Sequence, residues 1–137
     1  MRRTLTIVSA LIVLGIVVAT SWSALHPSAT LFLAPGATEV QVIEVTLGEQ
    51  LITYYAPGEA YAWRVAVARN LQQRGWVNPP WWRPDTPELS YAHRSSFWVG
   101  AFWSQADLGG SPNVAHIRVR RWIEVPWWWY WLQPGLR

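Results

Sequence analysis

The segment Val114–Val125, VAHIRVRRWIEV, alternates apolar and polar side chains with unusual regularity. Successive side chains of a β-strand point to opposite faces of the sheet, so this pattern predicts a strand with one buried and one solvent-facing side. The polar side is the more informative for function, because arginines and an aromatic ring would share it. The predicted core side carries Ile117, Val119, Ile123 and Val125, and the opposite side carries His116, Arg118, Arg120 and Trp122.

Four more strands are predicted before this one. Thr38–Thr46 is rich in β-branched residues, and with Gln50–Tyr55 it predicts a hairpin that turns at Leu47, Gly48 and Glu49. Glu88–Arg94 predicts a third strand, which places Leu89, Tyr91 and His93 on one face. Phe97–Ser104 is apolar on both faces, which predicts an interior position in the sheet. The composition of Asp107–Pro112, DLGGSP, predicts a turn before the fifth strand.

A helix is predicted between the second and third strands, over Glu59–Arg74. Its apolar residues recur at spacings of three and four, which gathers them on a stripe that would face the sheet. Gly75 follows the helix as a left-handed cap residue, and Trp76 is expected to fold back on Leu71. We therefore expect Trp63 and Trp76 to belong to the core. The predicted stripe consists of Ala60, Trp63, Val67 and Leu71.

The order strand, strand, helix and three strands predicts a small α+β fold, a ββαβββ two-layer sandwich with one helix on an antiparallel sheet. The domain organisation follows from changes in composition along the chain. We expect a membrane anchor over 1–25, a linker over 26–37, the α+β domain over 38–126 and a Trp-rich C-terminal tail over 127–137.

The first 25 residues predict a single N-terminal transmembrane helix. Thr4–Leu25 is an uncharged, mostly apolar run whose length as a helix, about 33 Å, is close to the ~30 Å hydrocarbon thickness of a bilayer. Arg2 and Arg3 precede it, so the positive-inside rule places the N-terminus in the cytoplasm and the domain outside it. The alternative is a cleaved signal peptide, after which the domain would be secreted. The predicted anchor residues are Leu5, Ile7, Leu11, Leu14, Val18 and Trp22.

The composition of the 137 residues limits the classes of function. The chain has no cysteine, so a disulfide framework and a thiolate metal site are excluded. Its net charge of +3 comes from 11 arginines and no lysine. Without Arg2 and Arg3, nine arginines face eight acidic residues, and the domain is close to neutral. We therefore expect no nucleic-acid partner.

Residues that could carry chemistry are sparse. His26, His93 and His116 are too far apart in sequence for a metal-binding motif, and we predict no metal and no cofactor. Asp85, Glu88 and Asp107 could in principle supply a pair of glycosidase carboxylates, but the aspartates lie in turn sequences where they often bond the local backbone. The sequence therefore predicts a protein that is not an enzyme.

The 12 tryptophans exceed what a domain of this size needs for its core, so some are expected to be exposed. They could contact the bilayer surface, a protein partner or a glycan. We predict a membrane-anchored extracytoplasmic protein that acts as a non-catalytic binding or assembly module, with a protein partner or a second copy; the alternative is a small envelope enzyme or a glycan-binding domain with an aromatic-lined groove. The candidate binding residues are Trp81, Trp82, Arg118, Arg120, Trp122, Trp127, Trp128 and Trp129.

Overall fold

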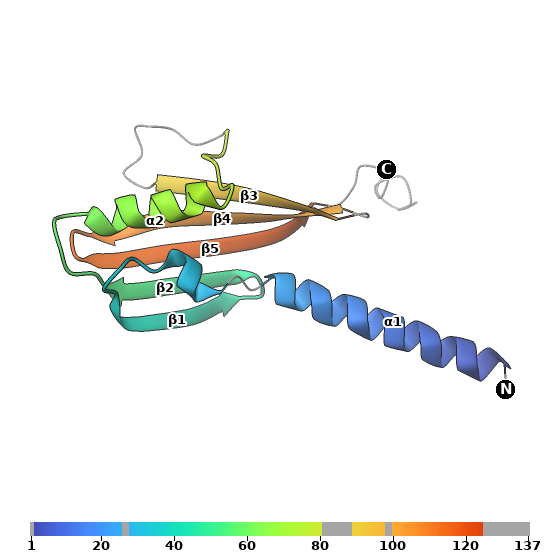
Figure 1. Ribbon diagram of the computed structural model, residues 1–137. Helices are drawn as coiled ribbons and strands as arrows, with labels where there is room; N and C mark the ends of the chain where they lie inside the picture. The colour runs from blue at the N-terminus through green and yellow to red at the C-terminus, as the bar shows by residue number, and fades with distance from the viewer. Residues whose placement is uncertain (1, 26–27, 81–88, 98–99, 125–137) are drawn as a thin grey trace, which may run out of the picture.

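The computed structural model describes residues 2–25, 28–80, 89–97 and 100–124, which form a small α+β fold (Figure 1). Five strands build one antiparallel sheet in the order β1-β2-β5-β4-β3. The ββαβββ order predicted for the domain is confirmed. In chain order, the elements are α1 (Arg2–Leu25), the 3₁₀ helix η1 (Ala29–Phe32), β1 (Thr38–Thr46), β2 (Glu49–Tyr55), α2 (Ala62–Gln73), β3 (Leu89–Phe97), β4 (Gly100–Ser111) and β5 (Val114–Glu124).

The strand β5 lies at the centre of the sheet, and its alternation separates the two faces as predicted up to Arg120. Ile123 was predicted in the core but is 52% exposed, because the sheet extends beyond α2 there, and Val125 lies outside the described residues. Ile117 and Val119 are buried, whereas His116, Arg118 and Arg120 between and beside them are exposed. The apolar side faces α2 and η1, which together cover one face of the sheet (Figure 1). Among the described residues, no helix lies on the other face (Figure 1).

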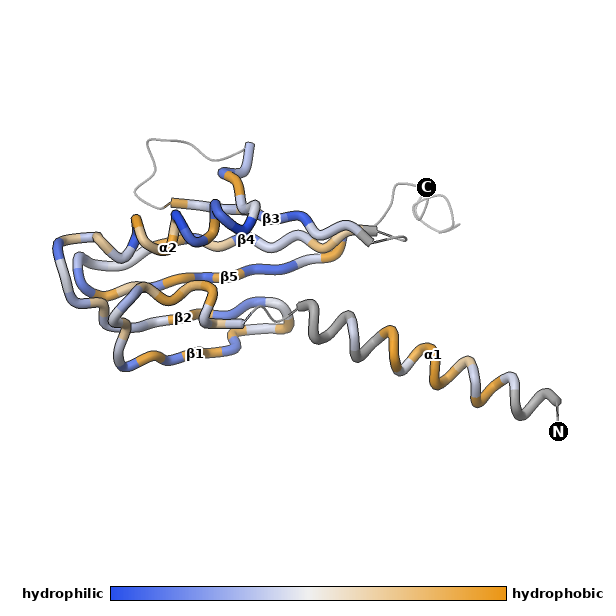
Figure 2. Tube along the Cα trace, in the orientation of Figure 1, coloured by the Kyte–Doolittle hydropathy of each residue, from blue (hydrophilic) through white to orange (hydrophobic). Residues whose placement is uncertain are grey.

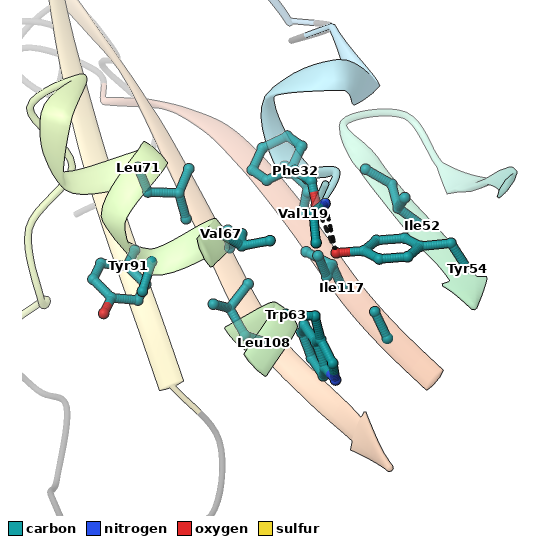
Figure 3. Packing of buried hydrophobic residues seen from close by; sticks show 14 of the residues in the cluster. Phe32, Ile52, Tyr54, Trp63, Val67, Leu71, Tyr91, Leu108, Ile117 and Val119 are labelled. Atoms are coloured by element: carbon teal, nitrogen blue, oxygen red, sulfur yellow. Dashed lines mark hydrogen bonds between the residues drawn. The ribbon is translucent and has the colours of Figure 1, made fainter. Parts of the chain in front are cut away.

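The core lies between the sheet and α2, where Trp63, Val67 and Leu71 are buried (Figure 3). Burial of these apolar side chains is the main favourable contribution to folding. The hydroxyl of Tyr54 on β2 donates to the carbonyl of Phe32 at 3.0 Å and accepts from the Ala34 amide at 3.3 Å, which fastens η1 to the sheet. Ala60 does not join the stripe, because α2 begins only at Ala62 and Ala60 is exposed.

The end of α2 matches the predicted cap. Gly75 has a φ of +82°, its amide donates to the Gln72 carbonyl, and the Trp76 amide donates to the Leu71 carbonyl. These are the two hydrogen bonds of a Schellman motif. Trp76 is buried there, with its ring edge-on to Phe32 and stacked on His93. The expectation that Trp63 and Trp76 are core residues is therefore confirmed.

The predicted turn at Asp107–Pro112 is wrong. β4 continues through Ser111, and Gly110 and Ser111 pair with Ala115 and Val114 of β5. The connection is therefore the two residues Pro112 and Asn113. A glycine pair signals a turn locally, but here Gly110 continues the strand. Without a Cβ it can adopt a φ of +120° and lie close to backbone atoms of β5.

The segment predicted as a membrane anchor forms the helix α1, which projects away from the domain (Figure 1). Its described side chains between Ile7 and Val17 are exposed. Within the described residues, no helix meets the combined length and apolarity required of a membrane span. Of the predicted anchor residues, Ile7, Leu11 and Leu14 are described and exposed, whereas the side chains of Leu5, Val18 and Trp22 lie outside the description.

Candidate functional site

The face of the sheet opposite α2, which we call the open face, collects the functional residues predicted on β5. Pairing registers place Arg118 beside Leu51 of β2 and Asp107 of β4, and Trp122 beside Trp103 of β4. Arg118, Arg120 and Trp122 alternate along β5 and therefore share one face, as predicted. Their paired residues on β2 and β4 lie on the same face.

The most buried polar group on the open face is Asp107, which is 8% exposed. Its Oδ1 accepts from the Ser90 hydroxyl at 2.6 Å and from Gln105 Nε2 at 2.8 Å, and its Oδ2 accepts from Arg120 Nη2 at 2.6 Å. Burial raises the pKa of this carboxyl, but the hydrogen bonds and the charge of Arg120 outweigh burial and leave the pKa below its ordinary value. Asp107 is therefore an ionised structural anchor for Arg120 rather than a proton donor near neutral pH.

Two stacked tryptophans extend the open face toward the end of β5. The rings of Trp103 and Trp122 are 6.3 Å apart between centroids and inclined by 10°. Trp103 Nε1 donates to Glu124 Oε2 at 2.8 Å, and Arg94 of β3 pairs with the same oxygen at 2.8 Å. The stack is thus held from one side by a carboxylate, and Trp122 keeps 39% of its surface exposed.

The sequence predicts that Trp98 and Phe102, or the residues alternating with them, share the open face with Trp122. The register contradicts Phe102, because it pairs with Ile123 and therefore lies on the helix-side face. Its neighbour Trp103 takes the place beside Trp122. Trp98 lies outside the described residues.

A shallow, open hollow of about 390 Å³ lies on the open face beside the arginines. Gly109 pairs with His116 and contributes no side chain there, which leaves room over this part of β4 on the open face. Arg118 Nε lies 3.3 Å from Glu49 Oε1 at the rim, where both groups reach solvent. The hollow is lined by Leu51, Asp107, Gly109, Gly110, His116, Arg118 and Arg120.

The charges of the open face are largely compensated. Arg118 pairs with Glu49, Arg120 with Asp107 and Arg94 with Glu124. Such a surface suits a partner that offers both hydrogen-bond donors and acceptors, rather than a highly charged polyanion. Over residues 2–25, 28–80, 89–97 and 100–124, no three His, Asp or Glu side chains gather closely enough to hold a metal ion.

Several predicted candidates lie outside the described residues. These residues are the two tryptophan clusters, two carboxylates and one histidine: Trp81, Trp82, Trp127, Trp128, Trp129, Asp85, Glu88 and His26. What was predicted for them stays a prediction.

Three residues organise the open face, and the sequence singled out only one of them. Asp107 was expected to bond the local backbone in a turn but instead accepts from the side chains of Ser90, Gln105 and Arg120. Trp103 and Glu124 were not among the predicted site residues. The sequence contains a signal for Glu124, because the alternation in Val114–Val125 places it on the same face as Trp122. The pairing of Asp107 with Arg120 has no local signal, because it depends on the register between two strands. Comparisons with models of protein families, with curated proteins and with solved structures found no match to this chain.

Proposed function

We propose that this protein is a single-pass membrane-anchored binding module whose domain lies outside the cytoplasm and whose open face contacts a protein partner. The observation that carries the proposal is the open face itself. It presents exposed arginines and a stacked tryptophan that a carboxylate network already holds in place. Arginine and tryptophan are the residue types most enriched at the energetic centres of protein interfaces.

The membrane anchor is supported by α1. Its apolar side chains point outward all round, with exposed fractions from 50% at Val8 to 62% at Leu11, and in Figure 2 much of the helix is coloured as hydrophobic. A helix that is apolar on every side cannot bury itself on one face of a domain, so lipid is its natural surrounding. Arg2 and Arg3 at its start favour a cytoplasmic N-terminus.

The network around Asp107 and Glu124 supports recognition. Each arginine that is fixed before binding loses less side-chain freedom when a partner arrives, so less binding free energy is spent on ordering it. The compensated charges favour specificity over non-specific attraction. The open face therefore suits a partner of mixed polarity with an apolar contact over Trp122.

A photo-reactive residue placed at His116 tests this proposal in the native membrane. His116 is exposed beside Arg118 on the open face, whereas Val65 is exposed on the solvent side of α2 and provides the matched control. We expect a defined cross-linked adduct from position 116 and none from position 65. Adding Arg118→Ala should remove the adduct while the domain stays folded, because the Arg118 side chain is exposed and its pair with the partly exposed Glu49 contributes little stability. Equal cross-linking from both positions would contradict the proposal.

A glycan is the second candidate for the open face, and the exposed ring of Trp122 is the observation that favours it. An aromatic ring that is stacked on one side and open on the other offers a flat surface against which a sugar ring can pack. Under this alternative, Trp122→Ser should abolish retention on immobilised cell-envelope glycan, and position 116 should give no protein adduct. Retention that survives Trp122→Ser would exclude Trp122 as the contact.

A further inference from the structure

The sheet is longer than the helix that covers it. α2 has 12 residues and a length of about 18 Å, whereas the 12 residues of β4 span about 40 Å. The helix begins beside the β4–β5 turn, where the Tyr61 amide donates to the Pro112 carbonyl, and it ends near His93. In the part of the chain that the structure describes, the sheet continues past α2 without helical cover on either face (Figure 1). We call this part the uncovered end; it comprises residues 43–50, 94–97, 100–104 and 120–124.

The uncovered end exposes apolar side chains from the β1–β2 turn and from β5. Leu47 in the β1–β2 turn is 74% exposed, and Ile123 on β5 is 52% exposed. Trp122 adds an exposed ring on the opposite face of β5. Exposure of these apolar side chains to water is unfavourable. They lie on both faces of this end of the sheet rather than on one.

The chain enters the domain at this same end. In Figure 1, α1 extends from the same end of the sheet as the β1–β2 turn and the end of β5. Only residues 26 and 27 separate α1 from Ser28, and three fully extended residue steps span at most about 11 Å. The described part of the chain also finishes here, at Glu124, and the sequence that follows is PWWWYWLQPGLR. If α1 is embedded in lipid, the uncovered end cannot be far from the bilayer surface.

The charges of the uncovered end balance. Its arginines are Arg94, Arg120 and Arg121, and its acidic residues are Glu44, Glu49 and Glu124, which gives three of each sign. Arg94 and Glu124 form an ion pair with each other. A surface with balanced charge and exposed Leu, Ile and Trp fits the interfacial zone of a bilayer, where amphipathic rings and short apolar side chains are stabilised without net charge.

We infer that the uncovered end docks on the bilayer surface beside α1, with Leu47 and Ile123 in the interfacial zone. This inference rests on the proposed anchoring of α1 in the membrane. It orients the domain with its strands rising from the bilayer, so the β4–β5 turn is the part farthest from lipid. The open face then stands sideways to the membrane and stays accessible to a partner in the same membrane.

Single cysteines can test this contact, since the chain has none of its own. The full-length variants Leu47→Cys and Ile123→Cys, and the control Val65→Cys on the solvent side of α2, are labelled with an environment-sensitive fluorophore. Each is reconstituted into phosphatidylcholine vesicles that contain a lipid with a nitroxide at its headgroup. We expect a blue shift and a loss of fluorescence at positions 47 and 123, with neither at position 65. Replacing part of the phosphatidylcholine by phosphatidylglycerol should leave the quenching unchanged, because the docking end has no net charge.

The outcomes separate this inference from the proposed anchoring. Protein that does not float with the vesicles overturns both. Protein that floats, with labels at 47 and 123 no more quenched than the label at 65, overturns the docking alone and leaves the anchor standing. Labels that are shielded from aqueous iodide but not quenched by the lipid nitroxide would show that a second copy covers the uncovered end, and would also overturn the inference. Lipid quenching at positions 47 and 123 alone supports it.

Discussion

At the scale of single residues, Tyr54 and Tyr55 are adjacent in β2 but have opposite roles. The Tyr54 hydroxyl is buried and bonds both Phe32 and Ala34, whereas Tyr55 is 42% exposed. We predict that Tyr54→Phe lowers the free energy of unfolding by about 1–2 kcal/mol, because it leaves a buried carbonyl and a buried amide without their partner. Tyr55→Phe should change it by less than about 0.5 kcal/mol. Denaturant unfolding of the full chain compares the two, and equal effects would contradict this role of Tyr54.

The same hydroxyl predicts a loss of stability in alkali. Burial raises the pKa of Tyr54 to about 12, against the weaker opposing effect of the Ala34 hydrogen bond, from an ordinary value of 10.0. The folded state thus favours the neutral phenol. The stabilisation that this gives is complete below pH 10 and is lost as the pH rises through 12. We expect wild-type stability to fall across this window more steeply than that of Tyr54→Phe. Parallel slopes for the two proteins in unfolding experiments would refute the assignment.

Asp107 predicts the opposite dependence on pH. The pKa of Asp107 in the folded protein lies below the ordinary value of 3.8. Its ionised form therefore stabilises the fold above pH 3.8, and this stabilisation is lost as the pH falls below 3.8. We predict that Asp107→Asn lowers the free energy of unfolding by about 1–3 kcal/mol at pH 7, because Arg120 and Ser90 lose an ionised acceptor, and that the difference shrinks toward pH 3. Glu49→Gln, which alters the partly exposed ion pair with Arg118, is the control and should cost less than about 1 kcal/mol. Unfolding at both pH values measures this.

At the scale of elements, two glycines with positive φ differ in what surrounds them. A Cβ added at Gly75 would meet only His93 at 4.0 Å, whereas one added at Gly110 would lie 3.0 Å from the His116 amide nitrogen and in severe overlap with the Val114 carbonyl. We predict that Gly75→Ala costs about 1 kcal/mol through backbone strain alone. Gly110→Ala must also move the backbone of β5 and should cost clearly more. Unfolding experiments that rank the two in the reverse order would contradict the β4–β5 pairing.

The elements whose residues repeat regularly could be predicted from sequence. The faces of β5 follow from its period of two, and the buried side of α2 from Trp63, Val67 and Leu71. The beginning of α2 could not be placed, because no capping side chain marks it and Tyr61 precedes it in a left-handed conformation. The site was predicted only in part, because only regular repeats within a single segment could be recognised. Periodicity placed Arg118, Arg120 and Trp122 on one face, but their partners on other strands depend on registers that no single segment encodes.

At the scale of the whole molecule, the described side chains of α1 take no part in the core of the domain. The apolar side chains of α1 between Ile7 and Val17 are exposed, and the core is built from η1, α2 and the sheet. Free energies of sites that share no contacts add independently. Changes within α1 should therefore alter where the protein is found without altering how stable its domain is.

The double variant Leu11→Arg and Leu14→Arg separates these two properties. Each arginine near the middle of a membrane-embedded helix costs about 2.5–3.5 kcal/mol of insertion free energy, so the protein should leave the membrane fraction. The denaturant midpoint of the domain, measured in mild detergent, should stay that of the wild type, because neither residue touches the sheet. Methionine at both positions preserves apolarity and is the matched control, expected to stay with the membrane. An arginine variant that resists a carbonate wash would contradict anchoring by α1, and one that lowers the midpoint would show that α1 packs on the domain.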